Sequence, residues 1–234
     1  MEAMRFRMLA TDYDNTIATR GVAGPEVRQA LEALRRSGRL IALVTGRTVA
    51  ELDNVFDDPG MFDALVLENG ALVRTSQGDR LLGPPVPAEL VTALRRDGVA
   101  PLAVGRGIIS TPATNTAPVR RVVAGLGLDL AFHHNRDSLM LMPTGIDKAL
   151  GLEAAAAACG VAMEAVVAVG DGENDCSMIA VAGAGVAVAN ATEMTKGCAG
   201  LVLDRPGPEG VIALCASMLE DDLAGLLSAA AGRR

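Results

Sequence analysis

Short apolar runs alternate with amphipathic stretches in the first third of the chain. Between residues 26 and 37, apolar side chains recur every three or four positions, with Pro25 before them and Gly38 after them, which predicts a helix. Continuous apolar runs of strand length lie on either side. The pattern predicts strands at 5–11, 40–44 and 64–67 and helices at 26–37 and 48–57. This alternation is typical of a parallel sheet with helices on its faces.

The last third of the chain repeats the alternation, starting near residue 144. The pattern predicts strands at 165–169, 185–188 and 201–203 and helices at 146–159, 174–181, 192–196 and 209–219. We therefore expect the two ends of the chain to build one α/β core with a Rossmann-like parallel sheet, made of residues 1–67 and 144–234.

The middle of the chain, residues 68–143, has a different texture. Two helical stretches at 87–97 and 115–125 lie among short alternating runs. Those runs predict strands at 71–74, 80–82, 102–104, 108–110, 131–134 and 138–142. We expect an inserted α+β domain with an antiparallel sheet, because strands and helices do not alternate regularly here.

Composition excludes several classes of protein. Half of the 234 residues are hydrophobic and 21% are charged, as in folded globular proteins. The net charge of −7 disfavours a sequence-independent nucleic-acid binder, and one Tyr, four Phe and no Trp leave little for base stacking. The apolar segment 150–170 is interrupted by Glu153 and Glu164, so we expect no membrane span. A cytoplasmic protein, monomeric or homodimeric, with a small-molecule partner is the expectation.

The four cysteines, Cys159, Cys176, Cys198 and Cys215, form no C-x-x-C pair. This spacing gives no support for a zinc site, and we expect reduced thiols that serve as small core residues. The insert carries more arginines than acidic residues, whereas the rest of the chain is acidic. Such an insert suits an anionic ligand, although solvated arginines on helix faces explain the same surplus.

An acidic cluster follows the first predicted strand. Asp12 and Asp14 are two positions apart, so in extended backbone their side chains point the same way. They lie at the carboxyl end of a strand, where open α/β sheets bind ligands. A polar turn with capping residues is the simpler interpretation of this cluster alone.

A second cluster, Gly-Asp-Gly-Glu-Asn-Asp at 170–175, follows the strand predicted at 165–169. Asp171, Asn174 and Asp175 offer the hard oxygen ligands that Mg²⁺ prefers. Neither cluster is an EF-hand loop, because the required sixth-position Gly is replaced by Ile17 in one and Cys176 in the other.

Two further motifs fit a phosphate. The first is Thr-Gly-Arg at 45–47, between a predicted strand and a predicted helix. A hydroxyl and free backbone N–H groups at the start of a helix form a phosphate-binding site or serve simply as a helix cap. Lys148 is one of only two lysines, the other being Lys196. A lysine ammonium can neutralise a phosphoryl oxygen or a nucleophilic carboxylate.

Taken in order, these motifs resemble the haloacid dehalogenase superfamily. The pattern is Asp-x-Asp-x-Thr at 12–16, Thr-Gly-Arg at 45–47, Lys148, and Gly-Asp-Gly-Glu-Asn-Asp at 170–175. The insert is similar to the C2-type cap of the Cof-like, type IIB phosphatase branch, and Glu-Asn-Gly-Ala at 68–71 resembles the segment that opens such caps. The resemblance covers essentially the whole chain. Within this branch, the chain is similar to phosphoglycolate and sugar-phosphate phosphatases.

The resemblance implies a Mg²⁺-dependent phosphatase of a small phosphorylated metabolite. Asp12 is then the nucleophile that forms an aspartyl-phosphate, and Asp14 is the general acid and base. Thr45, Gly46 and Lys148 are implied to bind the phosphoryl group. The implied metal ligands are Asp12, the backbone carbonyl of Asp14, and Asp171, with Asn174 and Asp175 in support.

Two positions depart from the family pattern. Asn15 stands where the family has Gly, and Asn tolerates positive φ, so we expect the turn to survive. Ala149 follows the lysine where Gly is frequent.

The candidates for binding a second anionic group of the substrate are Arg47, Arg106 and Arg136. A phosphomutase or phosphotransferase on the same fold, and a non-catalytic phosphate-binding module, are the alternatives.

Overall fold

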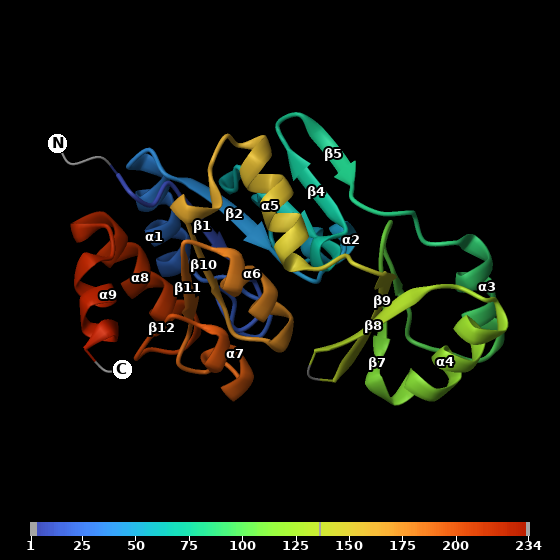
Figure 1. The fold of residues 1–234 in the computed structure, drawn as a ribbon. Coiled ribbons are helices and arrows are strands. Elements are labelled where there is room, and N and C mark those ends of the chain that lie inside the picture. The colour runs from blue at the N-terminus through green and yellow to red at the C-terminus, as the bar shows by residue number, and fades with distance from the viewer. Residues whose placement is uncertain (1–3, 136, 233–234) are drawn as a thin grey trace.

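In residues 4–135 and 137–232, which the computed structural model describes, an eight-stranded sheet runs through the larger part of the molecule (Figure 1). The strand order is β12-β11-β10-β1-β2-β3-β4-β5, parallel from β12 to β3 and antiparallel at β4 and β5. The strands are β1 (Met8–Thr11), β2 (Leu40–Val44), β3 (Ala64–Leu67), β4 (Leu72–Thr75), β5 (Gly78–Leu81), β10 (Val166–Gly170), β11 (Ala184–Ala187) and β12 (Leu201–Val202). The α/β fold expected from the sequence is confirmed.

Helices cover both faces of this sheet because its strands are apolar on both sides. In β1, Leu9 faces one hydrophobic cluster, while Met8 and Ala10 face another. The first cluster is closed by α1 (Pro25–Arg36) and α8 (Gly207–Asp221), and the second by α5 (Lys148–Ala158) and α6 (Cys176–Val181). The remaining helices here are α2 (Val49–Asp53), α7 (Glu193–Cys198), α9 (Ala224–Ala231) and the 3-10 turns η1 (Pro59–Met61), η2 (Glu68–Gly70), η4 (Met163–Ala165) and η5 (Glu173–Asp175).

A smaller antiparallel sheet with the order β6-β7-β9-β8 forms a separate layer, which we call the cap (Figure 1). Its β9 alternates: Leu139 and Leu141 pack under the cap helices, whereas Met140 and Met142 face the other way, toward Ala71 and Ile146. The cap elements are α3 (Ala88–Arg96), β6 (Ala103–Val104), β7 (Ile109–Pro112), η3 (Ala113–Asn115), α4 (Thr116–Gly125), β8 (Leu130–Asn135) and β9 (Ser138–Pro143).

The expected insert 68–143 includes two strands that the structure places in the larger sheet. β4 pairs antiparallel with β3, with Leu72 opposite Leu67, and β5 forms the edge of the same sheet. β5 is polar and exposed because it has only one neighbouring strand, which explains why its pattern looks like part of the insert. We propose that the cap proper begins after Leu81 and ends at Pro143.

The helices follow the predicted positions with small differences in length. α2 begins after a Thr48–Glu51 capping box and is only five residues long: it ends at Asp53, with Asn54 as its C-cap, before the expected end at residue 57. The helix expected at 174–181 opens with the 3-10 turn η5. None of the described helices combines the length and apolar character needed to cross a membrane.

The expectation of reduced thiols is wrong for two of the four cysteines. Cys176, at the start of α6, and Cys198, at the end of α7, form a disulfide with a Cα–Cα distance of 5.6 Å. Packing of α6 against α7 brings together two residues 22 positions apart, which the spacing of the cysteines does not reveal. Cys215 is a buried core residue as expected, and Cys159 is half-buried with a free thiol.

The packing of α5 on the sheet generates a stability prediction. A Cβ added at Gly151 in α5 would overlap Val66 and Gly70, whereas one added at Gly197 in α7 meets nothing within 4 Å. We expect Gly151→Ala to lower the free energy of unfolding by about 1–3 kcal/mol, because overpacking outweighs the gain in helix propensity. The matched variant Gly197→Ala should be neutral or stabilising by up to about 1 kcal/mol. Urea unfolding of both variants decides; equal effects would contradict the tight contact.

Candidate active site

Loops at the carboxyl ends of three parallel strands meet under the cap. Asp12 and Asp14 follow β1, Thr45 to Arg47 follow β2, and residues 171–175 follow β10. Since β1 lies between β2 and β10, these loops are neighbours in space. Together with the cap they enclose a cavity of about 390 Å³, a typical size for a small-ligand site.

Eight of the residues expected at the site line this cavity. They are Asp12, Asp14, Thr45, Gly46, Arg47, Asp171, Asn174 and Asp175. Lys148 lies beneath them, fully buried. Arg106 does not line the cavity; its side chain is half-exposed and pairs with Asp79. Arg136 lies outside the described residues.

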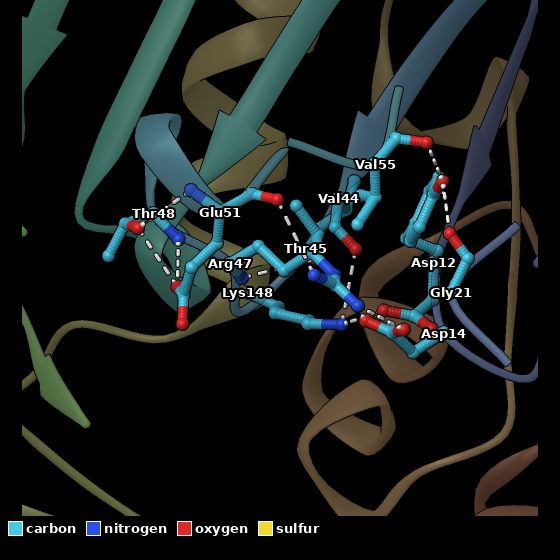
Figure 2. Close-up of polar contacts among 11 residues, drawn as sticks. Asp12, Asp14, Gly21, Val44, Thr45, Arg47, Thr48, Glu51, Val55 and Lys148 are labelled. Atoms are coloured by element: carbon cyan, nitrogen blue, oxygen red, sulfur yellow. Dashed lines mark hydrogen bonds and ion pairs between the residues drawn. The ribbon is translucent and has the colours of Figure 1, made fainter. Parts of the chain in front are cut away.

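Lys148 is the centre of the site (Figure 2). Its ammonium donates to Asp12 Oδ1 at 2.6 Å, to Asp175 Oδ1 at 2.5 Å and to the backbone carbonyl of Val44 at 3.1 Å. The first turn of α5 holds it in place, because the side chain of Asp147 caps that helix by accepting from the Leu150 amide. All three ammonium donors thus have partners.

Burial and unbalanced charge set the protonation of this cluster. Burial raises the pKa of Asp12 well above its usual range, and the charge of Asp175 raises it further, against the opposing effect of Lys148. Burial lowers the pKa of Lys148, but the charges of Asp12 and Asp175 outweigh burial, so the net shift is upward and the lysine stays charged.

Oxygens of Asp12, Asp171 and Asp175 lie within 4.8 Å of one another, and all three residues are buried. Three carboxylates against one ammonium leave excess negative charge in a place that water reaches poorly. Hard oxygen donors with excess negative charge are the surroundings that a divalent cation such as Mg²⁺ prefers. These residues therefore fit a divalent metal ion.

The loop after β10 is shaped by Asp175. Its Oδ2 accepts from the amides of Asp171 and Gly172, both at 2.9 Å, while its Oδ1 faces Lys148. Asp171 also accepts from the Thr16 hydroxyl at 3.2 Å, which ties this loop to the one after β1. Both oxygens of Asp175 are therefore occupied in holding the loop and the lysine.

Asp14 is held by Arg47 from the neighbouring loop (Figure 2). The guanidinium donates to Oδ2 at 2.7 Å and to Oδ1 at 2.8 Å. The hydrogen bonds to Asp14 raise the pKa of Arg47, so the guanidinium stays charged. Asn15 has a φ of 60°, which confirms the expectation that asparagine adopts the turn where the family has glycine.

The cap supplies five residues of the cavity wall that the sequence analysis did not single out: Ser110, Asn135, Asp137, Ser138 and Met140. Ser138 and Met140 are two positions apart in β9, so the strand alternation that the sequence does show places them on one face. The orientation of that face toward the core is set only by tertiary packing. Asn135 Oδ1 is buried without a hydrogen-bond partner among the described residues, next to Gly172.

A parallel sheet with helices on both faces, an inserted cap, and a lysine buried between carboxylates under that cap define a capped α/β protein with a charged site. A family model described as haloacid dehalogenase-like hydrolase matches residues 9–94 and 125–214. The chain belongs to this family, and the resemblance expected from the motifs is confirmed. This family match, together with curated relatives that are named phosphoglycolate phosphatase, shows a phosphoric monoester hydrolase that acts on a small phosphorylated substrate.

Curated relatives match over nearly their full length. The phosphoglycolate phosphatase of Methanopyrus kandleri is 31% identical over 232 residues, which cover 92% of this chain and 97% of the relative. The phosphoglycolate phosphatase of Halorubrum lacusprofundi is 28% identical, with 88% of this chain and 95% of the relative covered.

Solved structures share the fold. A haloacid dehalogenase-like hydrolase from Bacteroides thetaiotaomicron has a TM-score of 0.78 at 22% identity and covers 91% of this chain and 99% of its own. A sugar phosphatase of subclass IIB has a TM-score of 0.71 at 19% identity and covers 91% of this chain and 98% of its own. At this level of identity the likeness shows the fold alone.

The buried charge cluster generates a second prediction. In Lys148→Met, Asp12 and Asp175 lose their partner, so without metal we expect a loss of about 3–5 kcal/mol in the free energy of unfolding at pH 8. The loss should shrink toward pH 5. At low pH, a carboxyl whose pKa is raised in the folded state binds a proton and carries no unpaired charge. The stabilisation that this proton provides disappears as pH rises through the raised pKa.

The other lysine provides the control. Lys196 makes a surface ion pair with Glu193, so Lys196→Met should stay within about 0.5 kcal/mol of wild type at either pH. Urea unfolding at pH 5 and pH 8 with chelator measures both variants. A pH-independent loss in Lys148→Met would contradict the role of unpaired carboxylates.

Proposed function

We propose that the protein hydrolyses a small phosphate monoester through a phosphoryl intermediate on Asp12, with 2-phosphoglycolate as the first candidate substrate. The observation that carries the proposal is the position of Asp12 at the cavity wall, 2.6 Å from the buried Lys148 ammonium. The near full-length match to relatives named phosphoglycolate phosphatase supports the substrate.

The proposed reaction has two displacements. An Asp12 carboxylate oxygen attacks phosphorus, the bond from phosphorus to the substrate oxygen breaks, and Asp14 gives that oxygen its proton. Water then attacks the phosphoryl group on Asp12 while Asp14 takes a proton from the water, which releases phosphate and restores Asp12. Thr45 and the Gly46 amide orient the phosphoryl oxygens, and Lys148 balances charge on Asp12 and the phosphoryl group.

Asp12 and Asp171 are the proposed direct ligands of a Mg²⁺ ion, together with the backbone carbonyl of Asp14. Asn174 and Asp175 support it from the loop after β10, since both Asp175 oxygens already have partners. When bound, the ion would offset the excess negative charge and polarise the phosphoryl group.

Arg47 is proposed to bind the second anionic group of the substrate. In this structure its guanidinium donates to both oxygens of Asp14, the residue proposed to give the leaving group its proton. A substrate carboxylate offers Arg47 another partner of the same geometry. We propose that Arg47 moves from Asp14 to the substrate and so frees Asp14 to act as the acid.

The nucleophile assignment is tested with Asp12→Asn. We expect wild type to release phosphate from 2-phosphoglycolate and p-nitrophenyl phosphate with Mg²⁺ and not with chelator. The variant should lose at least about a thousandfold in kcat, because the amide does not form the phosphoryl intermediate. Phosphate release is measured for both proteins. Turnover by well-folded Asp12→Asn, or transfer of the phosphoryl group to an added sugar instead of water, would contradict the proposal.

The role of Arg47 is tested by a pair of arginine variants. We expect Arg47→Ala to raise the KM for 2-phosphoglycolate by about tenfold to a hundredfold, the equivalent of one lost charge-assisted interaction. p-Nitrophenyl phosphate lacks the carboxylate, so its KM should change less. Arg106→Ala removes an exposed arginine that pairs with Asp79 outside the cavity, and its KM should match wild type. Equal KM changes in the two variants would remove Arg47 from the substrate site.

A further inference from the structure

Three consecutive residues between β3 and β4 have left-handed backbone. Glu68 and Asn69 each have a φ of 55° and Gly70 has a φ of 104°. All three residues are buried. A non-glycine residue adopts this conformation at an energetic cost, and such backbone persists where surrounding contacts hold it.

The backbone of this segment binds the loop after β2 and the start of α5. The amide of Glu68 donates to the Arg47 carbonyl at 2.9 Å, and the amide of Asn69 donates to the Thr45 carbonyl at 3.0 Å. Gly70 lies so close to the backbone of Asp147 that a Cβ there would overlap its carbonyl. Asp147 immediately precedes Lys148, so the segment touches two of the loops that build the site.

The side chain of Glu68 reaches into the cap. Its Oε1 accepts from the Arg106 amide at 3.0 Å and its Oε2 from the Gly107 amide at 2.6 Å, in the turn between β6 and β7. A Cβ on Gly105 would lie 2.5 Å from Glu68 Cδ, so this turn closes around the carboxylate only because it is glycine there. Glu68 thus holds the cap hairpin by backbone donors.

The side chain of Asn69 lies between the cap and the loop after β10. Its Oδ1 accepts from Asn174 Nδ2 at 2.9 Å, and its Nδ2 donates to Met142 Sδ at 3.4 Å. Asn174 lines the cavity beside the acidic cluster, and Met142 belongs to the core-facing side of β9. One side chain therefore contacts both parts of the molecule.

From these contacts we infer that Glu68 and Asn69 are positioning residues: Glu68 sets the cap over the cavity, and Asn69 couples that position to the loop that holds Asp171 and Asp175. Neither residue lines the cavity or touches the reacting groups. The kinetic part of this inference rests on the proposed phosphatase reaction, whereas the structural part does not.

Asn69→Gly tests the coupling, because glycine keeps the left-handed backbone and removes only the side chain. We expect Mg²⁺ affinity, measured by calorimetry with the metal alone, to fall about tenfold, as for other residues that orient metal ligands. kcat should fall while Tm stays near that of wild type. Arg20→Gly is the matched control, since Arg20 is exposed and also has a positive φ, 51°.

Glu68→Gln tests the hold on the cap, because it keeps the shape of the side chain and replaces one acceptor oxygen by a donor. We expect hydrogen exchange at the Arg106 and Gly107 amides to accelerate about tenfold and the KM for 2-phosphoglycolate to rise. Gly105→Ala should reproduce this result with the carboxylate intact. The exposed Glu153, changed to Gln, is the control.

The outcomes separate this inference from the proposed reaction. Wild type that turns over no substrate refutes the reaction, and amide exchange and Mg²⁺ binding then decide the inference alone. The inference is overturned if hydrogen exchange at the Arg106 and Gly107 amides of Glu68→Gln is as slow as in wild type. It is also overturned if Asn69→Gly binds Mg²⁺ as tightly as wild type. A third outcome also overturns the inference. If the variants have a lower Tm and lose kcat equally on 2-phosphoglycolate and p-nitrophenyl phosphate, while amide exchange and Mg²⁺ binding stay at wild-type values, the segment is only a structural turn.

Discussion

The burial of one ammonium group among carboxylates is the constraint on which the rest of this structure depends. Lys148 is fully buried and satisfies Asp12, Asp175 and a strand carbonyl at once. An unpaired charge in such a place is costly, so the three loops and the start of α5 must meet within hydrogen-bond distance. The Asp147 cap and the glycine contact at position 70 fix where α5 begins, and these local features therefore serve the charge cluster.

The same cluster explains why a cap is useful. Core and cap share one cavity. The core contributes most of its charged groups, and the cap contributes hydroxyl, amide and thioether groups from β7, β8 and β9 together with Asp137 between β8 and β9. A cover that excludes water strengthens the interactions of Asp12 and Lys148 with a phosphoryl group. Its contacts with Glu68 and Asn69 join the cover to the loops beneath it, so the recognition of the substrate and the geometry of the charged site are not independent.

Much of this was predictable because it depends on local patterns. Apolar periodicity placed the strands and helices, and the motifs at 12–16, 45–47, 148 and 170–175 predicted residues that do come together. The pattern predicted the strands that became β4 and β5 but did not show that they pair with the core sheet, because the partner of such a strand is set by tertiary packing. It also failed for Cys176 and Cys198, which only the packing of α6 against α7 makes neighbours.

By itself, the sequence determined the fold class and the side chains that hold the charge cluster, since strand ends and helix starts follow from short-range periodicity and capping. Only the tertiary structure decided which face of the cap points toward the core. It also decided that Arg47 donates to Asp14 while Arg106 pairs with Asp79, and that the Glu68 carboxylate binds the cap hairpin. The physical reason is that these contacts join residues tens of positions apart, whose meeting depends on how whole layers pack and not on any local preference.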